Sequence, residues 1–372
     1  MPCVLPAGLW SVTATTPTHC WPSPCEYAVN TTHLIRIASL GATVPCTEGQ
    51  TILDAVREAG YEMPFSCNSG VCASCKGRVV AGRVNPGAAG DHTLTAEEIA
   101  HGAVLFCQAR PLTDIEIEPR QIEKTDTDAR RQIDAKVMRI DFLAPDVARL
   151  KLRFPAGEKV KFRAGQYLKV MLPDGQSRSF SMANPPHQND GAELHIRLLD
   201  GGVFSQRLTQ ELKVGDLLPV ELPHGDFYVR EESDAPIVML ASGTGFAPIK
   251  SMVEDGLRKG QPREIIIYWG ARTEKDLYLL DLARGWGEQS GLHFVPVLSE
   301  PDASWAGRTG LVHHAVLQDH DSLADKHVYA CGAPVMVSAA RSDFISNHGL
   351  PPDAFFCDAF VVAKPRSPAL AC

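Results

Sequence analysis

The 372-residue sequence lacks several features that would each mark a class of protein. It has no apolar run near the roughly 20 residues of a membrane-spanning helix, so we expect no membrane-spanning segment. It carries 36 basic and 44 acidic residues and no dense basic stripe, so nucleic acid is not an expected partner. Its 11 cysteines are too few for a disulfide scaffold, and its 44% hydrophobic content excludes wholesale disorder. This length predicts two or three domains.

Four of the cysteines form a pattern. Cys67, Cys72 and Cys75 have the spacing C-x4-C-x2-C, and Cys107 follows in a later segment. Plant-type ferredoxins bind a [2Fe–2S] cluster with this spacing, because one short loop supplies three thiolates and a distant cysteine supplies the fourth. The loop is rich in Gly, Ser and Ala, so backbone amides can approach the sulfurs and tune the reduction potential. Zinc is the alternative, but zinc loops use matched pairs of closely spaced cysteines, and here only one such pair is present.

The segments around these cysteines carry strand and helix signals. Alternating residues predict strands over 33–39, 76–84 and 114–118. Thr51 and Thr95 are predicted to cap two helices, the second through a T-x-x-E capping box. Together with the cysteine spacing, these signals make residues 33–120 resemble a plant-type ferredoxin domain. The resemblance implies a β-grasp fold for this domain.

The rest of the chain divides by its pattern. Residues 1–32 lack periodicity, and we expect a disordered extension or a start assigned too early, with Val29 as the alternative initiator. Residues 121–134 are highly charged and are expected to form a linker. Short alternating segments over 135–232 predict an antiparallel barrel, and alternating strands and helices over 233–372 predict a doubly wound parallel sheet. The predicted fold class is therefore multidomain, with α+β and α/β parts.

Four short motifs in the last two domains are weak signals when taken singly. They are Arg178-Ser179-Phe180-Ser181, Gly201-Gly202-Val203-Phe204-Ser205, Ser242-Gly243-Thr244-Gly245-Phe246-Ala247-Pro248 and Cys331-Gly332-Ala333-Pro334. The second opens a helix whose N-terminal amides suit a phosphate. The third follows a strand at the edge where α/β sheets bind ligands, although Pro248 stands where a full dinucleotide fingerprint has its third glycine.

The order of these motifs resembles the ferredoxin–NADP reductase superfamily. With the ferredoxin domain in front, the chain resembles three-domain NAD(P)H reductases of bacterial oxygenase systems over about residues 33–362. It is also similar to the CDP-6-deoxy-glucoseen reductase group and to terephthalate dioxygenase reductases. The resemblance implies a [2Fe–2S] cluster, FAD and NADH as cofactors, with Cys67, Cys72, Cys75 and Cys107 as the cluster ligands.

The resemblance also implies roles for the flavin-side residues. Arg178 is expected to hold the flavin pyrophosphate, and Ser179 is a neighbouring cofactor-binding residue. Phe180 is expected to stack on the isoalloxazine ring, where the family usually has Tyr, and Ser181 to lie near flavin N5. The second pyrophosphate turn, which favours FAD over FMN, is matched by Gly202 and Ser205.

On the nucleotide side, the family's dinucleotide turn is matched by Gly243, Thr244 and Gly245. Cys331 matches the residue beside nicotinamide C4, so Ser181 and Cys331 are the expected catalytic residues. Phe360 is expected to cover the flavin face. After the second strand of this domain, the basic residues Arg272 and Lys275 alternate with the acidic residues Glu274 and Asp276. A 2′-phosphate site gathers basic residues, so the pattern favours NADH over NADPH.

The expected function is electron transfer in the cytoplasm from NADH through FAD and the cluster, because a flavin links two-electron hydride chemistry to one-electron acceptors. The expected partner is a ring-hydroxylating dioxygenase, a monooxygenase or a ferredoxin-type protein. The alternative is a CDP-6-deoxy-glucoseen reductase that supplies a deoxysugar dehydrase, and a purely regulatory redox sensor is a third class. An oxygenase centre within this chain is not expected, because no Rieske ligand pairs occur. His313-His314 is predicted to lie on an exposed helix face.

Overall fold

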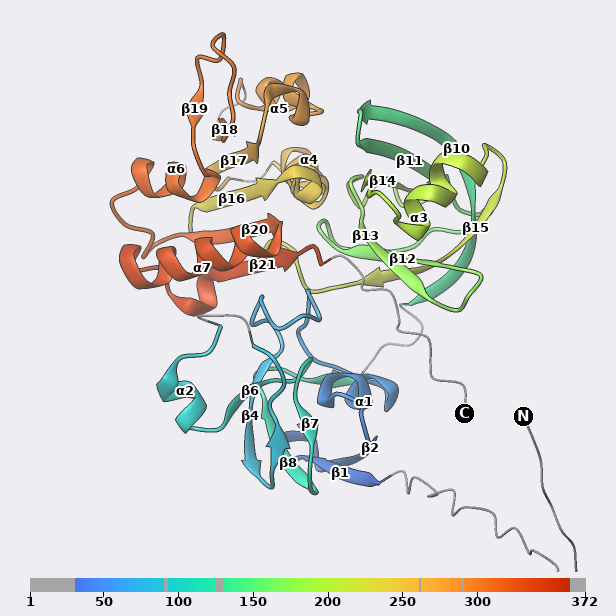
Figure 1. Cartoon of the computed structure of the whole chain (residues 1–372), viewed down its shortest axis with the longest axis vertical. Coiled ribbons are helices and arrows are strands. Elements are labelled where there is room, and N and C mark those ends of the chain that lie inside the picture. The colour runs from blue at the N-terminus through green and yellow to red at the C-terminus, as the bar shows by residue number, and fades with distance from the viewer. Residues whose placement is uncertain (1–30, 90–92, 125–129, 261, 289–290, 362–372) are drawn as a thin grey trace, which may run out of the picture. The chain divides into compact units, whose positions relative to one another are not determined.

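The computed structural model describes residues 31–89, 93–124, 130–260, 262–288 and 291–361. The expected extension over residues 1–32 lies almost entirely outside this range, as do Val29 and residues 362–372. The described residues form three modules, each with its own sheet (Figure 1). Within the described chain, no helix has both the length and the apolar character needed to cross a membrane.

The first module is a mixed five-stranded sheet in the order β2-β1-β8-β4-β6. Its strands are β1 (Thr32–Ile37), β2 (Ala42–Thr47), β4 (Lys76–Ala81), β6 (Ala103–Leu105) and β8 (Ile115–Pro119). β1 pairs antiparallel with β2 and parallel with β8, and the apolar side chains of α1 (Ile52–Glu58) share the core of this sheet. This is the expected β-grasp arrangement.

Both predicted helix caps in this module are confirmed. The Thr51 side chain accepts a hydrogen bond from the backbone amide of Asp54, and Thr95 and Glu98 form a complete capping box at α2 (Ala96–Ala100). Two short strand pairs complete the module. They are β3 (Tyr61–Glu62) with β9 (Glu123–Lys124), and β5 (Val84–Asn85) with β7 (Arg110–Pro111). Part of the expected linker is thus paired with the first module.

The second module is an antiparallel sheet in the order β13-β12-β15-β10-β11-β14. Its strands are β10 (Arg131–Ala144), β11 (Val147–Arg153), β12 (Tyr167–Met171), β13 (Ser177–Ser181), β14 (Gly191–Arg197) and β15 (Leu217–His224). A bridge between Met182 and Leu194 joins the two edges, so the sheet closes into the predicted barrel. The helical segment consists of α3 (Val203–Gln206) and a π-helical turn over Arg207–Glu211.

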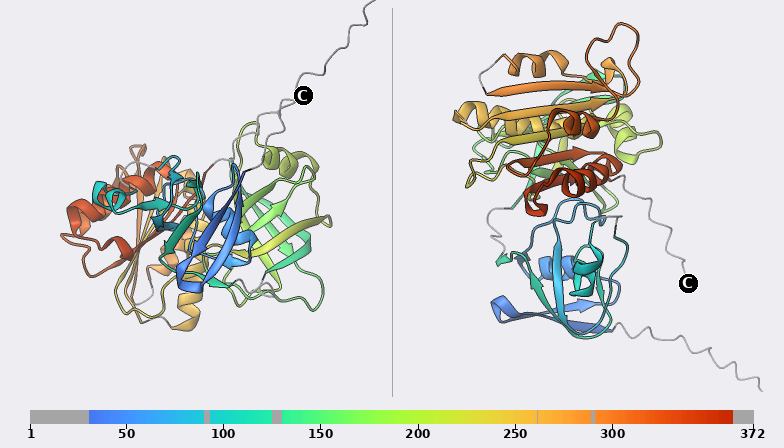
Figure 2. Two further views of the ribbon diagram at one scale, coloured as in Figure 1. Left: turned by 90° about the horizontal axis from the view of Figure 1, so that it is seen from below. Right: turned by 90° about the vertical axis from the view of Figure 1, so that its left-hand side faces the viewer.

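The third module is a parallel sheet in the order β19-β18-β17-β16-β20-β21. Its strands are β16 (Ile237–Ser242), β17 (Ile265–Ala271), β18 (Leu292–Leu298), β19 (Arg308–Thr309), β20 (His327–Gly332) and β21 (Phe355–Ala359). Its helices are α4 (Phe246–Lys259), α5 (Leu280–Trp286), α6 (Val312–Asp319) and α7 (Pro334–His348). The helices lie on both sides of the sheet (Figure 2), which confirms the doubly wound prediction.

Strand β16 is the switch point of this sheet. Later strands are added on both sides of it, β17 to β19 on one side and β20 and β21 on the other. Open α/β sheets bind ligands outside the carboxyl ends of the strands at such a point. Ser242 ends β16 and Gly332 ends β20, so two of the four motifs flank the switch point.

The barrel and the third module share a buried polar junction. Ser251 on α4 donates a hydrogen bond to the carbonyl of Asn184 at 2.7 Å, and the Lys250 ammonium donates to the carbonyl of Ala183 at 3.1 Å. Both side chains are buried, so these bonds fix α4 against the barrel. These contacts therefore fix the position of the barrel relative to the switch point at the end of β16.

Candidate functional site

The cysteine loop lies between β3 and β4 and has an unusual backbone. Asn68 and Ala73 adopt positive φ angles of 52° and 59°, a conformation that few non-glycine residues take. At Gly70, φ is 81°, and a Cβ would lie 2.5 Å from the carbonyl oxygen of Ala88. The loop is therefore wound tightly, so that Cys67, Cys72 and Cys75 lie within one short turn of chain.

The four predicted ligands are brought together as free thiols. Cys67 contacts Cys72 through its thiol, and Cys75 contacts Cys107 in the same way. A hydrogen bond with Cys357, together with burial, raises the pKa of the Cys72 thiol to about 12. Hydrogen bonding and burial also raise the pKa of the Cys67 and Cys75 thiols, whereas the hydrogen bond with Cys75 lowers the pKa of Cys107; a coordinated metal would deprotonate all four. Four convergent sulfurs, three of them on buried residues, thus fit a cluster.

Nitrogen donors approach two of these sulfurs. The backbone amide of Ser69 lies 3.4 Å from Cys67 Sγ, and the Gln108 side-chain amide lies 3.5 Å from Cys107 Sγ. Hydrogen bonds of this kind tune the potential of iron–sulfur clusters. The approach of loop amides expected from the composition is therefore present, and Cys107 receives both the Gly70 amide and the Gln108 side chain.

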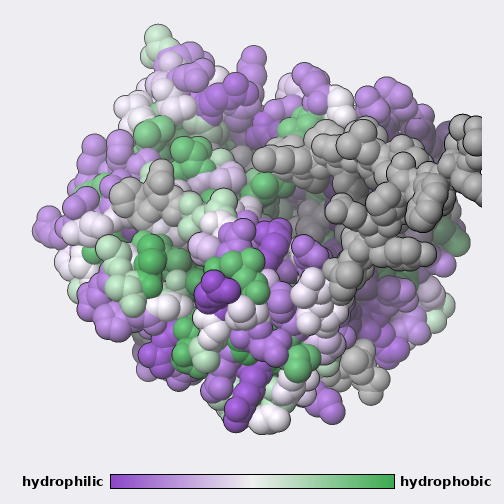
Figure 3. Space-filling model, turned by 60° about the horizontal axis from the view of Figure 1, so that its bottom comes forward, coloured by the Kyte–Doolittle hydropathy of each residue, from purple (hydrophilic) through white to green (hydrophobic). Residues whose placement is uncertain are grey.

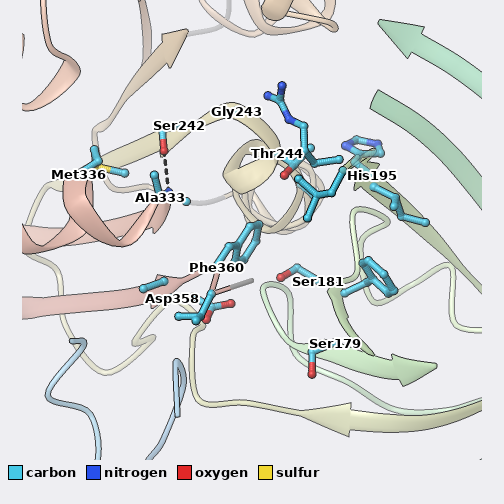
Figure 4. A pocket seen from close by; sticks show the side chains of 18 of the residues that line it. Ser179, Ser181, His195, Ser242, Gly243, Thr244, Ala333, Met336, Asp358 and Phe360 are labelled. Carbon is cyan, nitrogen blue, oxygen red and sulfur yellow. Dashed lines mark hydrogen bonds between the residues drawn. The ribbon is translucent and has the colours of Figure 1, made fainter. Parts of the chain in front are cut away.

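All three modules line one cavity of about 1160 Å³. This volume exceeds the 300–1000 Å³ of typical small-molecule sites, so it has room for extended dinucleotides. Ten of the predicted site residues line it: Cys67, Arg178, Ser179, Phe180, Ser181, Gly202, Ser205, Gly243, Thr244 and Phe360. Figure 4 shows Ser181 and Phe360 pointing into the same space from the barrel and from the end of β21.

The barrel wall of the cavity is β13. The Arg178 guanidinium is oriented by Gln176 Oε1 at 3.1 Å and by the Ser177 carbonyl at 2.9 Å. The ring of Phe180 packs against Phe204, with the centroids 5.0 Å apart. The Ser181 oxygen is buried, forms no hydrogen bond of standard geometry among the described residues, and lies near the Asp358 carboxylate. Because buried hydroxyls are normally paired, this oxygen fits a ligand atom in the cavity, as expected for a bound flavin.

The second predicted phosphate turn is closed by its own serine. Ser205 Oγ accepts a hydrogen bond from the backbone amide of Leu199 at 2.9 Å, and Gly202 caps α3. A Cβ at Gly202 would lie 3.0 Å from Ser205 Oγ. The turn is therefore compact, and Gly202 and Ser205 both line the cavity.

The nucleotide wall is the 3₁₀ turn Gly243–Gly245 between β16 and α4. The indole of Trp269 donates a hydrogen bond to the Gly243 carbonyl at 3.1 Å and stacks on Phe246 with the ring centroids 3.7 Å apart. A Cβ at Gly245 would lie 2.2 Å from the carbonyl oxygen of Cys331. Gly245 thus permits this turn to approach the end of β20 closely, while Gly243 and Thr244 line the cavity.

Cys331 is fully buried in the core and does not line the cavity. The next two residues, Gly332 and Ala333, do line it, and the backbone amide of Ala333 donates to Ser242 Oγ at 2.9 Å (Figure 4). The structure therefore places the Cys331 thiol behind the wall of the cavity, in the same hydrophobic core cluster as Phe246 and Tyr329.

Asp358 is a cavity residue that the sequence did not predict. Its carboxylate is buried on β21, accepts a hydrogen bond from the Ser66 hydroxyl at 2.7 Å, and lines the cavity close to Phe360 (Figure 4). Burial raises the pKa of this carboxyl group, and the nearby hydroxyls of Ser66 and Ser181 oppose that rise. An acidic residue within the apolar run FFCDAF was the available signal.

A second unpredicted group lies at the junction of the barrel and the third module. His195 lines the cavity, with Nδ1 at 3.1 Å from the Tyr278 hydroxyl and Nε2 at 3.0 Å from Glu193 Oε1. Burial lowers the pKa of His195 despite the carboxylate of Glu193. Burial therefore disfavours the charged form of the ring, which joins the barrel to the third module through Tyr278.

His313 differs from its prediction. The sequence places His313 and His314 on an exposed face, but the His313 side chain is buried and lines the cavity, whereas His314 is exposed. The reason is that α6 packs against both β17 and α7.

Three family models match the chain in the order of its modules. They are the 2Fe-2S iron-sulfur cluster binding domain over residues 35–112, the oxidoreductase FAD-binding domain over 134–228 and the oxidoreductase NAD-binding domain over 239–342. The order is that of the cysteine loop, the barrel wall and the nucleotide wall.

Known proteins match the chain over most of its length. The chain is 43% identical over 315 residues to CDP-6-deoxy-L-threo-D-glycero-4-hexulose-3-dehydrase reductase of Yersinia pestis, covering 84% of this chain and 94% of that protein. It is 38% identical over 343 residues to the terephthalate 1,2-dioxygenase reductase component 1 of Comamonas sp., covering 90% and 99%. The crystal structure of an Amycolatopsis cytochrome P450 reductase superposes with a TM-score of 0.68 at 34% identity, covering 88% and 98%. The chain therefore belongs to the family of iron–sulfur flavoprotein reductases, oxidoreductases that combine [2Fe–2S], FAD-binding and NAD-binding domains in one polypeptide.

Proposed function

We propose that the chain carries electrons from NADH to a separate oxygenase component, a ring-hydroxylating dioxygenase or a monooxygenase, by means of FAD and a [2Fe–2S] cluster. The observation that carries this proposal is the single cavity lined by the cysteine loop, β13 and the Gly243–Gly245 turn. Bound FAD supplies the conversion between hydride transfer and single-electron transfer. The modules assigned to these cofactors are residues 33–120, 135–232 and 233–372.

The residues of the barrel hold the flavin. The Arg178 guanidinium binds its pyrophosphate by charge-assisted hydrogen bonds, with Ser179 beside it, and the amides of the Gly202 and Ser205 turn bind the second phosphate. Phe180 supplies a ring contact without a hydroxyl group, and the Ser181 hydroxyl hydrogen-bonds the reacting edge of the flavin. Phe360 covers the ring from the opposite wall, supported by the hydrogen bond from its amide to the Gly332 carbonyl at 2.8 Å.

The nucleotide wall binds NADH. The amides of Gly243 and Thr244 before α4 receive the pyrophosphate, while the close contact between Gly245 and the Cys331 carbonyl sets the spacing of this turn and the end of β20. Cys331 therefore shapes the nicotinamide pocket from behind Gly332. The cluster ligands are Cys67, Cys72, Cys75 and Cys107.

Asp276 is the basis for preferring NADH. Asp276 lines the cavity, and its carboxylate accepts hydrogen bonds from the Thr273 amide at 3.0 Å and hydroxyl at 3.1 Å. A fixed negative charge here opposes a 2′-phosphate group. Arg272 also lines the cavity, so the site retains a positive charge for the other phosphates.

The surface around the ferredoxin module is mixed in hydropathy, which suits docking of a transient protein partner. Figure 3 shows hydrophobic side chains there in small groups separated by hydrophilic ones. Interfaces of non-obligate complexes have such mixed surfaces. We place the chain in the cytoplasm, where NADH is available and thiols stay reduced.

The test uses the full chain loaded with its cofactors. We expect iron, FAD and rapid reduction of both ferricyanide and cytochrome c by NADH, with NADPH much slower. Reduced chain mixed with a candidate oxygenase should then be reoxidised as the oxygenase centre is reduced. Binding of all cofactors without NADH-dependent turnover would contradict the proposal and favour a regulatory sensor.

A deoxysugar dehydrase is the second candidate partner. The observation that favours it is the 43% identity to the Yersinia pestis dehydrase reductase. The same reoxidation experiment with a dehydrase in place of the oxygenase decides between the two. The true partner should reoxidise the chain at least about tenfold faster than the other, since docking selects partners by a few kcal/mol.

A further inference from the structure

Strand β21 contacts the cysteine loop at two points. The Ser66 hydroxyl, next to Cys67, donates to Asp358 Oδ1 at 2.7 Å, and the Cys357 thiol donates to the carbonyl oxygen of Cys72 at 3.3 Å. Ser66 precedes the first turn of the loop, and Cys72 follows it. Neighbouring residues of one strand therefore hold both ends of that turn.

The contacts lie in protected surroundings. Cys72, Cys357 and Asp358 are exposed by only 3%, 3% and 6%. Cys72 belongs to the hydrophobic core of the third module rather than to that of its own module. A hydrogen bond to a buried carboxylate is among the stronger kinds, whereas a thiol is a weak donor. By contrast, the ion pair of Arg120 with Asp353, just before β21, is exposed and contributes little.

The same strand reaches the cavity. Cys331 and Asp358 are register partners on β20 and β21, and Phe360, just beyond β21, hydrogen-bonds to Gly332. Asp358, Ala359 and Phe360 line the cavity. A displacement of β21 would therefore move the cysteine loop and the cavity wall together.

We propose that Cys357 and Asp358 are positioning residues that hold the cysteine loop against the cavity and so control electron passage from cavity to cluster. The inference rests on the proposed function. It assigns a role to a cysteine outside both the ligand set and the cavity lining. The two contacts favour a docked loop, so weakening either one increases the fraction of chains in which the loop has moved away from β21.

The test compares three variants of the full, cofactor-loaded chain. Cys357→Ala removes the thiol that donates to the Cys72 carbonyl. Cys357→Ser keeps a hydroxyl donor at that position, and Cys46→Ala is the matched control. Cys46 is also buried, on β2, and its thiol faces the carbonyl of Gln50 at 3.6 Å. The readouts are amide hydrogen exchange of residues 66–76 without NADH, and the ratio of cytochrome c to ferricyanide reduction with NADH.

For Cys357→Ala we expect amide exchange of the loop about threefold to fivefold faster, the size for one weak hydrogen bond. The cytochrome c to ferricyanide ratio should fall by a similar factor. Cys357→Ser should restore both, and Cys46→Ala should leave both at the level of the unchanged chain. Ser66→Ala, which removes the bond to the carboxylate, should accelerate exchange of the loop at least tenfold.

Equal loop exchange in Cys357→Ala and Cys46→Ala would overturn the positioning role, as would a failure of Cys357→Ser to restore it. These results are separable from failure of the proposed function. In that case the unchanged chain itself would not reduce ferricyanide with NADH, while the hydrogen-exchange comparison would still report on the loop.

Discussion

The cysteine loop and the cavity beside it are assembled from the chain in different ways. Three of the four predicted cluster ligands come from nine consecutive residues of the loop, Cys67–Cys75, and Cys107 comes from a later segment. The cavity takes its lining from strand ends and turns between Ser66 and Val361. The loop can therefore be recognised in a short stretch of sequence, whereas the cavity exists only after three modules have folded and packed.

This difference predicts that damage to one region leaves the other intact. The loop depends on backbone winding at Asn68, Gly70 and Ala73, while the cavity depends on packing across the Ser251–Asn184 junction. Strand β21 contacts both regions. The variants below separate the two regions in order of decreasing effect.

The largest effect is expected for Cys72→Ala, which removes one of four cluster ligands. We expect loss of the cluster and of NADH–cytochrome c reduction, with NADH–ferricyanide reduction retained because FAD and nucleotide bind elsewhere. Iron content and visible absorption report the cluster, and the two assays report the split. Equal survival of both activities would show that electrons do not pass through the cluster.

Arg178→Ala is expected to have the opposite effect to Cys72→Ala, because it should weaken FAD binding and leave the cluster in place. Loss of a charge-assisted contact to a phosphate should weaken FAD binding by about tenfold to one hundredfold, while iron content stays at that of the unchanged chain. Flavin release on dilution measures the first, and iron analysis the second. Arg153→Ala is the control, because Arg153 is an exposed barrel residue outside the cavity. Unaltered FAD affinity in Arg178→Ala would contradict the assigned role.

A smaller change is expected for Asp276→Asn, which keeps an oxygen acceptor for Thr273 and removes the charge. The kcat/KM ratio of NADPH to NADH should rise about fivefold, corresponding to about 1 kcal/mol for a partly exposed charge pair. Glu274→Gln is the control, since Glu274 lies near Arg284 and does not line the cavity. An unchanged ratio would move nucleotide selection to other residues.

The smallest effect is expected on the loss of folding stability at acidic pH. Burial lowers the pKa of His195, so the unfolded chain binds a proton there at a higher pH than the folded chain does. The resulting stability is present above about pH 6.5 and is lost as pH falls toward the lower folded value, by at most about 1.4 kcal/mol per pH unit. His195→Gln should therefore show a shallower fall in Tm between pH 7 and 5.5. His187→Gln, at an exposed position, should match the unchanged chain.

Much of the molecule follows from local patterns. Alternation and turn signals predict the barrel strands, and strand–helix alternation predicts the parallel sheet. The caps at Thr51 and Thr95 form as expected, because each involves residues three apart. The prediction fails at His313, which is buried by packing between elements that no local pattern describes.

The sequence by itself determined the cysteine ligand pattern, the order of the three modules and the turns that face the cavity. These properties depend on residues close together along the chain, where spacing and backbone preference are sufficient. Only the tertiary structure placed Asp358 beside Ser66, Cys357 beside Cys72 and the Cys331 thiol behind the wall of the cavity. Such contacts join residues up to 292 positions apart, and they arise from the packing of complete modules rather than from any local signal.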